Sequence, residues 1–165
     1  MIVEREIQHG EYLYSVTFST GVDAFFYSEE AASLLGNSVE IVEVSLDRLQ
    51  GEGVDQPDII YRVTDVIKDY MLDNPRAILC YWCDDMNPVP CAEHNLNMLP
   101  QQYRNRLFTA LFVRTMSRNQ CTIFQDKSLC INPDYHPMYI HVIHRSEHAD
   151  IADGVMRFVS QSYGK

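Results

Sequence analysis

The chain has 165 residues, of which 46% are hydrophobic and 22% are charged, a balance typical of one folded domain with its own core. Its net charge of −10 at pH 7 argues against binding to DNA or RNA, because attraction to phosphates needs a basic surface. No apolar run is long enough to span a bilayer, and the stretch from Met1 to Tyr14 lacks the apolar core of a secretory signal. We therefore expect a cytoplasmic protein that does not bind membranes and whose cysteines are reduced.

The first third of the chain predicts strands. Residues Tyr12–Phe18 alternate between aromatic or apolar and small polar side chains, which is the period of a half-buried strand. A turn at Ser19–Gly21 leads into a second strand at Val22–Tyr27, so the two form a hairpin. A short helical turn is expected at Ser28–Leu35, and Val39–Leu46 alternates as a third strand.

The middle of the chain predicts two helices around a buried strand. Pro57–Asn74 carries apolar residues at helical spacing, and Asn74-Pro75 ends the helix. Ala77–Trp82 is continuously apolar, as in a central strand. After a loop at Asp84–Leu99, Pro100 fits the first turn of a second helix that runs to about Met116.

The last third predicts two strands in a hairpin, a further strand and a final helix. The hairpin pairs Cys121–Phe124 with Leu129–Ile131 around a turn at Asp126-Lys127-Ser128. Tyr139–Ile143 is the last strand, and a helix begins at Ser146–Ala149. With the hairpin counted as one β element and the short turn at Ser28–Leu35 left out, the order β-β-β-α-β-α-β-β-α predicts a single α+β domain over residues 1–165, with helices packed on a mixed or antiparallel sheet.

Charge is distributed unevenly along the chain. Between Glu40 and Asp73, nine acidic residues stand against three basic ones, which leaves a net charge of −6. Between Asn95 and Gln125 the charged residues are four arginines: Arg104, Arg106, Arg114 and Arg118. The two segments either compensate each other in the fold, or the arginines form a basic patch for an acidic ligand.

Cys83-Asp84 at the end of the buried strand and Gln102-x-Arg104-x-Arg106-Leu107-Phe108 at the start of the second helix resemble a family of small uncharacterised bacterial proteins. The aromatic N-terminal hairpin and the helix at Ile59–Tyr70 are similar to that family too. Met86–Leu99 forms a longer loop here. The resemblance implies a bacterial protein and supplies no activity.

One candidate site is a zinc site. Cys80, Cys83, Cys91 and His94 supply three thiols and one imidazole, a set that zinc accepts. Cys80 and Cys83 lie three residues apart on a predicted strand, which places them on opposite faces. The alternative is that these are buried thiols without a metal.

A second candidate is a magnesium site. Asp84 and Asp85 follow the predicted central strand, where carboxylates could bind Mg²⁺ for phosphoryl chemistry while Arg104 and Arg106 hold phosphate. The alternative is an ion pair between Asp84 and one of these arginines.

Four histidines near the C-terminus form a third candidate: His136, His141, His144 and His148. They lack the His-Glu-x-x-His spacing of a zinc protease, and His141 and His144 fall on opposite faces of the last strand. We expect them to be hydrogen-bonded structural residues.

No complete catalytic set is found, so we predict a non-enzymatic protein-binding module without a cofactor. An antitoxin- or immunity-like role is an analogy with small acidic proteins that cover a basic surface of their partner. Its partner is an unknown protein, and Arg104 and Arg106 are the expected binding residues. The alternative is a metal-dependent hydrolase or nuclease that uses Asp84 and Asp85.

Overall fold

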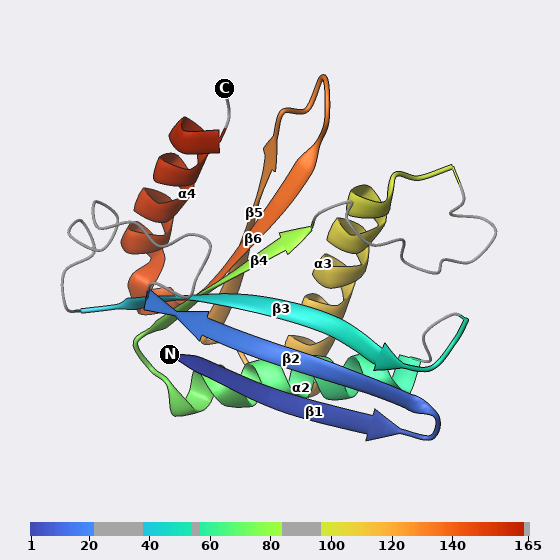
Figure 1. Cartoon of the computed structure of the whole chain (residues 1–165). Coiled ribbons are helices and arrows are strands. Elements are labelled where there is room, and N and C mark those ends of the chain that lie inside the picture. The colour runs from blue at the N-terminus through green and yellow to red at the C-terminus, as the bar shows by residue number, and fades with distance from the viewer. Residues whose placement is uncertain (22–37, 54–56, 84–96, 164–165) are drawn as a thin grey trace.

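A twisted six-stranded sheet forms the centre of the protein (Figure 1). The computed structural model describes residues 1–21, 38–53, 57–83 and 97–163. The strands, in their order across the sheet, are β1 (Ile2–His9), β2 (Tyr12–Thr20), β3 (Glu40–Gln50), β4 (Ala77–Cys83), β6 (Met138–Arg145) and β5 (Phe124–Ile131). The pair β3 and β4 is parallel, and the other pairs are antiparallel.

The helices are α2 (Pro57–Asp73), α3 (Pro100–Arg118) and α4 (Ala149–Tyr163), with a short 3-10 turn η3 (Ser146–His148) before α4. Figure 1 shows α2 behind β1 to β3, while α3 and α4 lie on either side of the strands β4 to β6. The helices predicted from Pro57, from Pro100 and near the C-terminus, and the central strand predicted at Ala77–Trp82, are therefore confirmed. No helix in the described part of the chain is long and apolar enough to cross a membrane.

Two apolar clusters hold the helices on the sheet. In the first, Ile59, Val63 and Ile67 of α2 pack on the inner face of β1 to β3. In the second, Val155 and Val159 of α4 pack on the opposite face of the sheet. This arrangement is the predicted α+β architecture in one compact domain. Because α2 and α3 share one face, their contact sets the position of the candidate site.

The first strand was not predicted. β1 is an edge strand that pairs with β2 through a turn at Gly10, whose φ of +60° suits a tight hairpin. It contributes few inward apolar residues, Val3 and Ile7, so its period was too weak to recognise. The predicted strand at Val22–Tyr27 and the helical turn at Ser28–Leu35 lie outside the described residues.

The predicted hairpin of Cys121–Phe124 with Leu129–Ile131, around a turn at Asp126-Lys127-Ser128, is wrong, because Phe124–Ile131 is one continuous strand. The predicted turn residues lie in the middle of β5, and the chain reverses at residues 132–137, where Asn132 has a φ of +52°. Polar residues usually mark turns. Here the side chains of Asp126 and Lys127 instead find partners in the fold, on β6 and on α4 respectively.

Phe18 of β2 offers a test of how α2 is held. Its side chain is fully buried, and its ring stacks on Tyr70 of α2 at 3.8 Å between centroids. We expect Phe18→Ala to lower the free energy of unfolding by about 3–5 kcal/mol, because a buried ring is removed and a cavity remains. Urea unfolding followed by circular dichroism measures this change.

The matched control is Leu72→Ala, near the end of the same helix, whose side chain is 46% exposed. A change within about 0.5 kcal/mol is expected for this surface position. Equal losses for the two variants would contradict the packing described for α2.

Candidate functional site

Helix α3 is anchored on the sheet by Phe108. The Phe108 ring stacks on Tyr81 of β4 at 4.6 Å and lies 4.5 Å from the imidazole of His141 on β6. Phe108 is half-buried, and Gln101 and Thr115, which are fully buried, lie on the inner side of the helix. The opposite side of α3 is therefore turned to solvent.

A second set of contacts ties α3 to α2. The Thr115 hydroxyl donates a hydrogen bond to the Thr64 hydroxyl at 2.7 Å. The Arg118 guanidinium contacts both carboxylate oxygens of Asp65, at 2.6 and 2.7 Å. This ion pair joins the basic segment to the acidic one, so part of the predicted charge compensation occurs in the fold.

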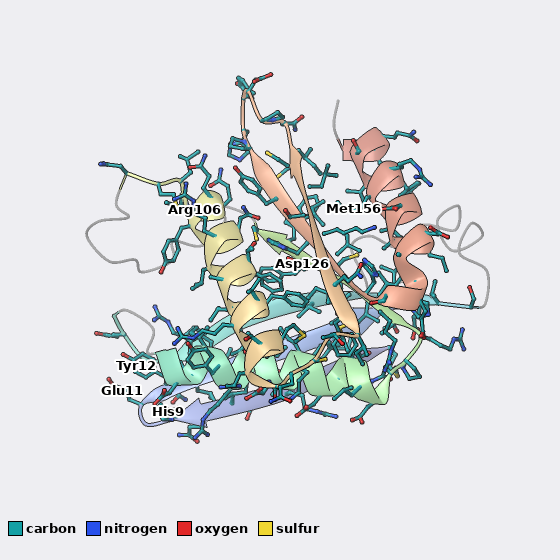
Figure 2. The ribbon with its side chains drawn as sticks, turned by 180° about the vertical axis from the view of Figure 1, so that it is seen from behind. His9, Glu11, Tyr12, Arg106, Asp126 and Met156 are labelled. Atoms are coloured by element: carbon teal, nitrogen blue, oxygen red, sulfur yellow. The ribbon has the colours of Figure 1, made fainter. Side chains whose placement is uncertain are left out.

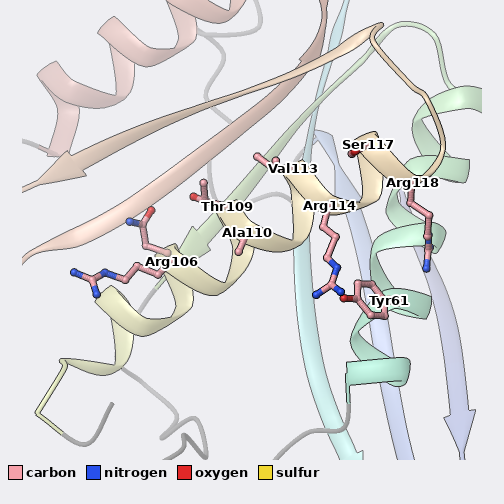
Figure 3. A pocket seen from close by; sticks show the side chains of 9 residues that line it. Tyr61, Arg106, Thr109, Ala110, Val113, Arg114, Ser117 and Arg118 are labelled. Atoms are coloured by element: carbon pink, nitrogen blue, oxygen red, sulfur yellow. The ribbon is translucent and has the colours of Figure 1, made fainter. Parts of the chain in front are cut away.

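An open groove of about 960 Å³ runs along the solvent side of α3 (Figure 3). We call it the arginine groove and define it as the outer face of α3 from Asn105 to Arg118 together with Tyr61 of α2. The side chains that matter for binding are Arg106, Thr109, Val113, Arg114, Ser117 and Arg118. Helix side chains rather than backbone groups therefore make up its surface.

The two ends of the groove differ in their electrostatic surroundings. At one end, Arg114 and Arg118 lie over the ring of Tyr61, 5.2 and 5.1 Å from its centroid. At the other end Arg106 extends from the first turns of α3 (Figures 2 and 3). Within the described residues, neither Arg106 nor Arg114 forms an ion pair with a carboxylate, whereas Arg118 does.

The two arginines predicted to act together point in different directions. Arg106 is exposed and lines the groove, whereas Arg104 is half-buried and is not part of the lining. Residues two apart on a helix do not share a face, which explains the separation. Arg114 and Arg118, rather than Arg104, line the groove together with Arg106.

The predicted metal ligands are only partly described. Asp84, Asp85, Cys91 and His94 lie outside the described residues. Cys80 and Cys83 are both fully buried in β4. Their spacing places them on opposite faces of the strand, so β4 does not bring these two thiols together. The described part of the chain contains no group of three or more His, Cys, Asp and Glu side chains arranged for a metal ion.

The histidines are dispersed. His141 and His144 are buried on opposite faces of β6, and His136 is exposed in the β5–β6 connection. His144 Nδ1 lies 2.7 Å from the carbonyl oxygen of Arg145. His148 lies in η3, 3.8 Å from the Glu147 carboxylate. These contacts are consistent with the structural role expected for the histidines.

The structure shows a buried polar pair that the sequence analysis missed. His141 Nδ1 lies 2.8 and 3.0 Å from the two carboxylate oxygens of Asp126, whose side chain is 9% exposed. His141 Nε2 is buried without a hydrogen-bond partner among the described residues. Asp126 was assigned to a turn, so the pair could have been found only by extending β5 through its two charged residues.

Comparison with protein-family models and with curated proteins finds no match to this chain. The resemblance to a family of small bacterial proteins therefore stays a prediction.

The cysteines provide a test of the described strand. Burial, together with the nearby charge of Glu43, raises the pKa of the Cys80 thiol to about 12. The thiolate is the nucleophile, so Cys80 should resist iodoacetamide at pH 8 in the folded protein. Cys121 and Cys130, which are half-buried, should react first. Mass spectrometry of tryptic peptides reads out the order, and rapid labelling of Cys80 without unfolding would contradict it.

The Asp126–His141 pair makes a prediction about stability. Asp126→Ala leaves a buried imidazole without its partner, and we expect a loss of about 1–3 kcal/mol in the free energy of unfolding. The control is Asp69→Ala, which removes a 65% exposed side chain paired with Lys68 at 3.2 Å. That change should cost less than about 1 kcal/mol. Equal urea midpoints for the two variants would show that the buried pair contributes no more to stability than the exposed pair.

Proposed function

We propose that this chain is a non-enzymatic protein-binding module that binds an acidic segment of another protein through the arginine groove. The observation that supports it best is the exposure of Arg106 and Arg114, without a carboxylate partner among the described residues, on a chain with a net charge of −10. Arginine forms short, paired hydrogen bonds to carboxylates and is enriched at the centres of protein interfaces.

The net negative charge of the chain does not prevent an acidic segment from binding in the arginine groove. At physiological ionic strength, charges more than about 8 Å apart in solvent are largely screened. The arginines in contact with the partner therefore dominate the local interaction. The negative charge of the rest of the surface disfavours binding of long anionic polymers, which would extend beyond the groove.

We place this module in the cytoplasm, and an antitoxin- or immunity-like role remains an analogy for it. That analogy expects a basic partner surface, whereas the arginine groove suits an acidic segment. The alternative prediction, a metal-dependent hydrolase or nuclease, depends on Asp84 and Asp85. Both residues lie outside the described part of the chain, and no contact in the structure favours this alternative.

The proposal is tested by site-specific photo-crosslinking in the native cell. A photoreactive phenylalanine analogue at Ser117, which lines the groove, should give a discrete cross-linked product, and the same group at Gln161 on α4 should not. Arg106→Glu with Arg114→Glu should reduce the product at least about tenfold, because like charges then face the partner.

The charge-matched control is Arg5→Glu with Arg157→Glu, two exposed arginines on β1 and α4. This control should leave the cross-linked product unchanged. A product that falls equally in both double variants, or that forms equally from Gln161, would count against the groove as the binding surface.

A further inference from the structure

We infer that the segment bound in the arginine groove is an α-helix that presents two carboxylates eight residues apart, one to Arg106 and one to Arg114. This inference rests on the proposed function and specifies the partner's chemistry. It follows from how side chains are arranged along the outer face of α3 (Figure 3).

Two parallel rows of side chains, each with a spacing of four residues, make up that face. One row carries short neutral side chains: Thr109, Val113 and Ser117. The neighbouring row carries Arg106, Ala110, Arg114 and Arg118. Rows with this spacing are the ridges and grooves through which two helices interlock, with their axes about 8–10 Å apart. The short row leaves room for a partner helix, and the other row supplies the charge.

The spacing of the two arginines matches a helical ligand. Arg106 and Arg114 are eight residues apart, which corresponds to a rise of about 12 Å. A partner helix that packs row against row places residues eight apart at the same rise. Its glutamates can then meet both arginines, while a small residue between them lies against Ala110. Val113 is 60% exposed and offers an apolar contact beside them.

An extended segment fits this groove less well than a helix. A strand leaves half of its backbone N–H and C=O groups to be paired by a sheet edge. The groove presents side chains of α3 and Tyr61 and no sheet edge, so those groups would find few partners. A helix satisfies its own backbone hydrogen bonds and brings only side chains to the contact.

A second copy of this chain cannot occupy the groove with its own α3. In a two-fold symmetric dimer the same surface faces itself, so Arg106 and Arg114 would meet arginines. Arg106 and Arg114 of the two copies would repel each other, since neither has a carboxylate partner among the described residues. The occupant we infer is therefore an acidic helix of another protein.

The inference is tested by fluorescence anisotropy with labelled peptides of about 20 residues, a length at which alanine-rich sequences form helices in water. The parent peptide carries glutamates at positions eight apart with alanine midway between them. One control has the same composition with one glutamate moved by two positions, which places it on the other side of the helix. Another control has a central proline, which breaks the helix.

We expect the parent peptide to bind at least tenfold more tightly than either control peptide. Val113→Glu should abolish binding of the parent, because it places a carboxylate in the neutral row of α3. Val113 is exposed and glutamate is a good helix former, so the fold should be retained, which circular dichroism verifies. Ser160→Glu, at an exposed position on α4, is the matched control and should bind the parent normally.

Three results would overturn the inference, and they differ in what they say about the proposed function. Equal binding of all three peptides, lost in Arg106→Gln with Arg114→Gln, would show that the groove takes acidic segments of any conformation, so the proposed function would stand. Tighter binding of a DNA duplex than of the parent peptide would overturn the inference and the proposed function together, in favour of a nucleic-acid ligand. No binding of any peptide at millimolar concentration would also overturn both.

Discussion

The packing of Phe108 between Tyr81 and His141 determines where α3 lies, and the candidate site depends on that position. A helix can bury only one side on a sheet. Once Phe108 and Thr115 are directed inward, the other side of α3 faces solvent. That outer side holds three of the four arginines of α3. Their exposure is thus a consequence of one aromatic contact.

The ties between α2 and α3 shape the site further. The Arg118–Asp65 ion pair and the Thr115–Thr64 hydrogen bond hold the two helices together at one end of the groove. They bring Tyr61 under Arg114, where its ring supports the guanidinium. An exposed ion pair contributes little to stability, so this contact acts mainly through geometry. It leaves Arg106 and Arg114 as the positive charges available to a partner.

Most of the fold was predictable from the sequence because its main elements carry strong periodicity. The helix at Pro57 and the strand at Ala77 are examples, since each contributes a continuous apolar surface to the core. The edge strands were harder to recognise. β1 has few inward apolar residues, and β5 carries Asp126 and Lys127 in its centre. Inward charged residues are a common way in which proteins protect sheet edges, and they hide the strand from a periodicity argument.

The candidate site was only half predictable. The concentration of arginines is visible in the sequence, and so is the helix that carries them. Which of them share a face depends on which side of α3 packs on the sheet, and the weak amphipathic pattern of that helix does not decide it. Arg104 was therefore chosen in place of Arg114. The pairing of Arg118 with Asp65 links residues 53 positions apart, which local patterns cannot show.

The central claim is that the outer face of α3 is a protein-binding surface. The most direct test is an NMR titration of the ¹⁵N-labelled protein with an acidic helical peptide. The account predicts that amide shift changes cluster at residues 105–118 and at Tyr61, and that they saturate with increasing peptide. Shift changes confined to β1–β3 or α4, or no changes at millimolar peptide, would contradict it.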